Sequence, residues 1–100
     1  MVKLTVLYHH PTDPAAFESY YAATHMPLAG KMDVRRIETA KVTGAPDGSK
    51  PAFYRTAELY FDDAAHMQRS TAAPEAKAAV ADIRNFASGG VTLLVSEVDG

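Results

Sequence analysis

The sequence predicts a single α+β domain in which two strand-and-helix units are joined through a hairpin. Apolar residues recur at helical spacing in Asp13 to Leu28 and in the segment that Pro74 starts, and aspartates that suit a helix start stand at Asp13 and at Asp62 and Asp63. Four runs are rich in β-branched and aromatic residues, with period-two alternation. The clearest turn of the chain, Gly44 to Ser49, lies between the second and third of these runs. One hundred residues are enough for one core and too few for two, so we expect one domain over residues 1–100.

The first strand and the first helix are predicted from the N-terminal residues. Val2 to His9 alternates modestly and contains β-branched residues, which favours a strand. A helix is expected over Asp13 to Leu28, because the aspartate can accept a hydrogen bond from a free amide of the first turn and Pro14 suits the first helical position. Pro27 removes a backbone donor, so the helix should kink or stop close to His25.

The rest of the chain supplies a hairpin, two short helical segments and a last strand. Val34 to Thr43 and Phe53 to Phe61 are predicted to pair as a hairpin. Ala64 to Ser70 should form a short helix, Pro74 should start a second helical segment, and Val91 to Val98 is the last strand. The resulting order, β-α-β-β-α-β, is that of a ferredoxin-like fold, with a four-stranded antiparallel sheet and both helices on one face.

The two faces of this predicted sheet differ in character. The face assigned to the helices is mainly apolar and consists of Val2, Leu4, Val6, Ala57, Leu59, Phe61, Val91, Leu93 and Val95. The opposite face is amphipathic and consists of Thr5, Leu7, Tyr54, Thr56, Tyr60, Thr92 and Leu94. A surface of this kind is more readily buried against a partner than left in water. We therefore expect a two-fold homodimer in which the sheets face each other.

Composition and motifs exclude several function classes. A net charge of −2 and a pI near 6.0 give no basic field for nucleic acid. Without cysteine there is no disulfide, thiol nucleophile or thiolate metal site. Neither GxGxxG nor GxxxxGK[ST] occurs, so we expect no nucleotide or flavin cofactor. The N-terminal apolar run is too short for a membrane span and lacks a signal-peptide cleavage site, which predicts a cytoplasmic protein without a membrane partner.

Several segments together resemble the EthD family. They are LTVLYHHP, AFESYYAATHMPLA with its His-x-Pro-Leu end, GAPDGS, AELYFDD and NFASGGVTLLVSEV. The resemblance implies a dimeric α+β barrel assembled sheet to sheet, with a ligand cavity in each subunit between helices and sheet. The family is named after a protein encoded beside an ether-degrading cytochrome system. Relatives on this architecture include cofactor-free monooxygenases, lactone isomerases and polyketide-modifying proteins, so the fold does not determine the reaction.

His25 is the leading candidate for catalysis. An imidazole exchanges protons near neutrality, and a position at the end of a helix within the core-facing stripe would tune it. As a general base it could take a proton from a phenol or from a carbon next to a carbonyl, while Tyr8 and Tyr21 orient the oxyanion. The alternative is that His25 only hydrogen-bonds a backbone group to close the helix near Pro27.

Aromatic residues are the candidates for ligand binding. Tyr8, Tyr21, Phe61 and Phe86 could line an apolar cavity, with His9 at its mouth. The alternative is that they are plain core residues.

Other polar residues have weaker claims to a role. Adjacent residues of a strand point to opposite faces, so His9 and His10 cannot bind one metal ion together, and His9 with His25 lacks a recognisable carboxylate spacing. We predict no metal site. His66 is expected on the polar side of a short helix, in solvent. Asp82 could pair with groups at the rim of the cavity or be solvated like most helix-surface charges.

The sequence thus supports a small dimeric protein that binds a hydrophobic or aromatic catabolite. The reaction class would be that of a cofactor-free oxidoreductase or isomerase, with His25 as general acid/base. A second hypothesis is a non-catalytic binding or carrier protein for a fatty acid or aromatic ligand. A third is an assembly module whose cavity has collapsed.

Overall fold

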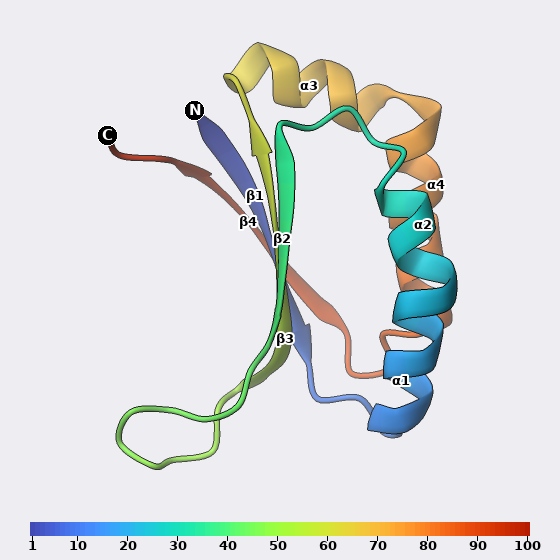
Figure 1. Ribbon diagram of the computed structural model, residues 1–100, viewed down its shortest axis with the longest axis vertical. Helices are drawn as coiled ribbons and strands as arrows, with labels where there is room; N and C mark the ends of the chain where they lie inside the picture. The colour runs from blue at the N-terminus through green and yellow to red at the C-terminus, as the bar shows by residue number, and fades with distance from the viewer.

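A computed structural model describes all residues, 1–100, and shows a four-stranded antiparallel sheet with helices on one face (Figure 1). The strands are β1 (Val2–His9), β2 (Arg36–Lys41), β3 (Phe53–Phe61) and β4 (Val91–Glu97). Their order across the sheet is β2-β3-β1-β4, with each neighbouring pair antiparallel. This arrangement confirms the predicted ferredoxin-like fold.

The first helix is one continuous rod built from three kinds of turn. It consists of α1 (Pro14–Tyr20), a π-helical turn (Tyr21–His25) and α2 (Met26–Ala29). The Met26 amide donates to the Tyr21 carbonyl five residues earlier, which is the widened π-helical bond. The helix therefore does not stop near His25, which was one of the two outcomes expected of Pro27: the proline falls in the first turn of α2, where a missing amide is tolerated, and the rod continues to Ala29, one residue beyond the expected Leu28.

The second half of the chain adds α3 (Ala64–Ala72) and α4 (Pro74–Asp82), which a single 3₁₀ turn (Ile83–Asn85) extends. In Figure 1, α4 runs beside the first rod over the sheet, whereas α3 lies across one end of it. Both predicted N-terminal caps are present. The Asp13 carboxylate accepts from the Ala16 amide at 3.1 Å, and the Asp63 carboxylate accepts from the amide of residue 66 at 2.8 Å. None of these helices has the length and apolar character needed to cross a bilayer.

A β-bulge changes the face on which one tyrosine lies. Tyr8 pairs with Arg55 but His9 pairs with Phe53, so Tyr54 is the extra residue of β3. Its ring is 5.1 Å from that of Phe17, and its hydroxyl donates to the carboxylate of Glu18 at 3.0 Å. Tyr54 therefore lies on the helix side of the sheet, and its assignment to the opposite face was wrong.

The core lies between the sheet and the helices and is unusually aromatic. It consists of Val6, Tyr8, Phe17, Tyr21, Tyr54, Ala57, Leu59, Phe61 and Phe86. The other face of the sheet carries no helix (Figure 1). It combines a polar group, in which Lys3 and Glu58 form an ion pair at 2.9 Å, with the half-exposed side chain of Leu94.

Candidate functional site

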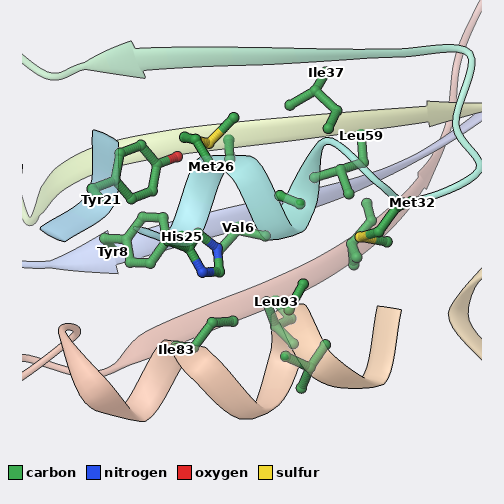
Figure 2. A pocket seen from close by; sticks show the side chains of 15 residues that line it. Val6, Tyr8, Tyr21, His25, Met26, Met32, Ile37, Leu59, Ile83 and Leu93 are labelled. Atoms are coloured by element: carbon green, nitrogen blue, oxygen red, sulfur yellow. The ribbon is translucent and has the colours of Figure 1, made fainter. Parts of the chain in front are cut away.

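An apolar cavity of about 60 Å³ lies between the helices and the sheet (Figure 2). Fifteen residues line it, contributed by all four strands, by the first rod and the loop that follows it, and by α4 with its 3₁₀ turn, and fourteen of them are hydrophobic. His25 is the exception. Figure 2 shows Tyr8, Tyr21 and His25 at one end of the cavity, and Ile37, Leu59 and Met32 at the other. The cavity therefore has one end with polar atoms and one end without.

The π-helical turn places His25 at the polar end. The residue is only 5% exposed, and its ring lies between two aromatic neighbours. The Tyr21 ring is stacked on it with a centroid distance of 5.6 Å, and the Phe86 ring is tilted against it at 4.6 Å. These contacts restrict the rotation of the imidazole.

The partner of His25 is Asp82, the last residue of α4. The imidazole Nδ1 is 3.1 Å from the carboxylate Oδ2 of Asp82, which is itself buried. The other carboxylate oxygen accepts from the Tyr20 hydroxyl at 2.6 Å and from the side-chain amide of Asn85 at 3.0 Å. Burial by itself would raise the pKa of Asp82, but the hydrogen bonds from Tyr20, Asn85 and His25 outweigh it, so the pKa lies below its ordinary value. Asp82 is therefore ionised at neutral pH and anchored by three donors.

Two tyrosines complete the polar end of the cavity. The hydroxyl of Tyr21 is buried close to that of Tyr8, and it donates a hydrogen bond to no protein group. Burial is the main cause that raises the pKa of Tyr8 and of Tyr21, so both phenols are protonated at neutral pH. Arg55 lies over the Tyr21 ring, 4.9 Å from its centroid, and its guanidinium is paired with Glu18. The rings of Tyr8 and Tyr21 thus form the cavity wall beside His25, and the Tyr21 hydroxyl lies behind that wall.

The structure brings together only part of the residue set predicted for the site. His25, Tyr8 and Tyr21 line the cavity, and Phe86 packs directly behind the His25 ring. Phe61 does not line it, because it is fully buried in the core on the side of α3.

His9 lies away from this cavity on the face of the sheet that bears no helix. There its Nε2 is 2.8 Å from the Thr92 hydroxyl, and its ring contacts that of Phe53. Strand alternation explains this placement, since Tyr8 points into the core and its neighbour must point away.

Sequence reasoning did not identify Asp82 as the partner of His25. It gave only two alternatives for Asp82, a group that pairs at the rim of the cavity or a solvated charge. No local signal marks it, because the two residues are 57 positions apart. Most of the apolar lining was also missed. Met26, Met32 and Ile37 are partly buried side chains whose position depends on how the first rod and β2 pack.

His66 was predicted to be solvated, and this prediction was wrong. The residue is only 6% exposed. Its Nδ1 accepts from the Asp62 amide at 3.0 Å, its Nε2 is 3.2 Å from a carboxylate oxygen of Asp33, and its ring meets that of Phe61 edge to face. Both ring nitrogens are therefore used within the protein. No group of three or more His, Asp or Glu side chains among the 100 residues is arranged to hold a metal ion.

Comparisons with known proteins agree with this architecture. Residues 9–90 match the EthD domain. A Rhodococcus erythropolis protein described as an uncharacterized 11.0 kDa protein in the thcB-thcC intergenic region is 42% identical over 98 residues, which cover 97% of this chain and 94% of that protein. The crystal structure of an EthD family protein from Bacillus halodurans superposes with a TM-score of 0.92 at 36% identity, over 99% of both chains.

Two more distant structures share the fold alone. A cofactor-independent oxygenase from Streptomyces nogalater, SnoaB, has a TM-score of 0.63 at 16% identity and covers 99% of this chain and 92% of its own. A protein from Bacteroides fragilis described as dimeric and ferredoxin-like has a TM-score of 0.65 at 18% identity, over 97% of this chain and 95% of its own.

Proposed function

Because this chain belongs to the EthD domain family, we propose that it binds a small hydrophobic or aromatic molecule between helices and sheet, with His25 as general acid/base. One observation carries the proposal. A cavity lined otherwise by hydrophobic residues contains a single imidazole, and a buried carboxylate orients that imidazole. An apolar cavity with a few convergent polar groups is the usual form of a small-molecule site.

The geometry suits proton transfer. The Nε2 atom of His25 makes no hydrogen bond within the protein, whereas Nδ1 is held by Asp82. Nε2 would take a proton from a hydroxyl or from a carbon next to a carbonyl, and Asp82 would stabilise the imidazolium that forms. Tyr8 and Tyr21, which line the same end of the cavity, would orient the oxygen on which negative charge develops. Isomerisation and cofactor-free oxidation both begin with such a step, and the oxygenase that shares this fold supports the second.

A homodimer assembled sheet to sheet is part of the proposal. The outer face of the sheet bears no helix, and Leu94 on that face is 49% exposed. The structural neighbour from Bacteroides fragilis is described as dimeric. Leu94→Arg should convert a dimer into a monomer in light-scattering measurements, because a charge in the centre of an apolar contact cannot be hydrated. Val95→Arg is the matched control, since Val95 is also exposed but lies on the opposite parity of β4. Equal masses for both variants and the wild type would contradict this mode of assembly.

A carrier protein is the second candidate function, and the same cavity favours it. A carrier would hold the ligand unchanged, and His25 would then serve only as a hydrogen-bond partner. Native mass spectrometry of the purified protein separates the two candidates. A retained ligand that is never converted supports the carrier, whereas conversion that is lost in His25→Ala supports the enzyme.

Blocking the cavity tests whether it binds a ligand at all. Toluene titrated into ¹⁵N-labelled protein should shift the amide signals of residues around the cavity. Ala79 is buried and lines the cavity, so Ala79→Leu should abolish these shifts, whereas Ala78→Leu on the exposed side of α4 should preserve them. If toluene produced no shifts in the wild type, the cavity would not be a ligand site and the proposal would fail.

A further inference from the structure

We propose that Asp82 holds His25 in the tautomer whose Nε2 carries no hydrogen, so that the cavity selects a neutral, hydroxyl-bearing aromatic ligand of the phenol type. This inference rests on the proposed function, because it assumes that the cavity binds a small aromatic molecule. It goes further in naming the polar group that the ligand carries and the residue that determines this choice.

The tautomer follows from the hydrogen bonds around Asp82. A carboxylate without a proton can only accept, and Asp82 accepts from Tyr20, Asn85 and His25. Nδ1 of His25, 3.1 Å from Oδ2, must therefore be the nitrogen that carries the hydrogen. In the neutral imidazole the other nitrogen, Nε2, is then an acceptor.

Asp82 is well placed to enforce this state, because it is itself fixed. The Tyr20 hydroxyl on the first rod and the Asn85 amide one turn beyond α4 occupy the other carboxylate oxygen. The His25 ring is confined by the stacked Tyr21 ring and the tilted Phe86 ring, which oppose a flip that would exchange the two nitrogens. Asp82 is therefore a positioning residue that acts through His25.

The complement of this site is a hydroxyl group. Nε2 of His25 offers an acceptor that makes no hydrogen bond within the protein. A phenolic hydroxyl satisfies it, since its hydrogen is donated to Nε2. A methyl group in its place would leave Nε2 unpaired.

A charged ligand fits the site poorly. No lysine or arginine lines the cavity, and Arg55, which lies over the Tyr21 ring, is already paired with Glu18. A carboxylate would lose its hydration without gaining a cation, and it would approach the negative charge of Asp82. The site therefore discriminates against anions of the same size.

Three probes test this selectivity on the full chain. Phenol, toluene and benzoate share one ring and differ at one substituent, and all three can be titrated at pH 8, where phenol is neutral and benzoate is an anion. We expect phenol to bind about fivefold more tightly than toluene, because it forms the hydrogen bond to Nε2 of His25 that toluene leaves unmade. Benzoate should bind most weakly of the three.

Asp82→Asn tests the positioning role. The asparagine amide can donate to Nδ1, which would move the hydrogen of His25 to Nε2 and remove the acceptor from the cavity. The phenol-to-toluene affinity ratio should fall to about one, while toluene binding is retained. Asp33→Asn is the matched control, because it alters the carboxylate beside the other buried histidine, and it should leave the ratio unchanged.

A spectroscopic readout keeps the proposal testable even if Asp82→Asn does not fold. ¹⁵N spectra of histidine-labelled wild-type protein at pH 8 should show the His25 hydrogen on Nδ1 and an unprotonated Nε2. Hydrogen on Nε2 would overturn the inference. Equal affinities for phenol and toluene, or tighter binding of benzoate, would also overturn it while leaving the cavity as a binding site. Failure of both phenol and toluene to bind would instead reject the proposed function itself.

Discussion

His25 and His66 are both buried and both lie beside an aspartate, yet the structure uses them in different ways. Both nitrogens of His66 are taken, one by the Asp62 amide and the other by Asp33, whose side chain is 75% exposed. His25 has only one nitrogen bonded, and its partner Asp82 is buried. Under the proposed function, the second nitrogen of His25 is the atom that meets the ligand.

This difference shows that the burial of an imidazole says little about its role. His66 joins the end of β3, the start of α3 and the segment before β2, and its ring is saturated by those contacts. A group whose hydrogen-bonding capacity is fully used stabilises the fold. An oriented group with unused capacity beside a cavity can act on a ligand.

The largest expected effect is a difference in stability between the alanine variants of Asp82 and Asp33. Asp82→Ala should lower the free energy of unfolding by about 3 kcal/mol, because it removes the acceptor shared by three buried or partly buried donors. Asp33→Ala should cost about 1 kcal/mol or less, since an exposed partner contributes little. Urea denaturation of both variants measures the difference. Equal losses of unfolding free energy would mean that the His25–Asp82 and His66–Asp33 pairs contribute alike to stability, which would contradict the contrast between them.

The next largest effect is expected from His66→Ala, which should lower stability without changing ligand binding. His66→Ala should destabilise the fold by about 2 kcal/mol, because it leaves the Asp62 amide unpaired and removes a ring packed on Phe61. Toluene binding in the cavity should be unaffected once the variant is folded. A toluene affinity that falls with His66→Ala would show that the two histidines are coupled.

Asp82 should contribute to the loss of stability in acid. The folded pKa of Asp82 is held below the ordinary aspartate value of about 3.9, so its contribution to stability is complete above that value. It is lost as the pH falls through the lowered pKa of the folded state. Asp82→Asn should therefore flatten the decline of stability below about pH 4. Thermal unfolding of the wild type and of this variant from pH 6 to pH 2 measures both slopes; the lowered pKa values of Glu18 and Glu58 should leave a residual decline in both proteins. Equal slopes for the two proteins would contradict the prediction.

The smallest change in stability is expected from Tyr21→Phe. Its hydroxyl is buried without a partner, so removing it should change the free energy of unfolding by about 1 kcal/mol or less, and in the stabilising direction. A clear loss of stability would mean that the hydroxyl has a structural partner after all.

Much of the fold could be predicted because it depends on local rules. The Asp13 cap, the Pro14 start and the period-two strands each follow from the chemistry of a few neighbouring residues. The inward position of His25 also followed, since helical spacing places it on the same side as Tyr21.

The errors arose where neighbours along the chain do not decide the outcome. The bulge that moves Tyr54 to the helix side is one extra residue in a ladder, and strand alternation cannot detect it. The π-helical turn before Pro27 likewise belongs to a continuous rod that the proline was expected to kink or end.

Sequence alone determined the order of the elements, the helix starts, the apolar face of the sheet and the presence of one histidine in the core-facing stripe. Only the tertiary structure decided what that histidine can do. The pairing of His25 with Asp82 joins residues 57 positions apart, and it exists because the first rod and the end of α4 pack side by side over one sheet. The same packing leaves a hollow at the unbonded nitrogen, whereas the contacts at the far end of the sheet leave none at His66.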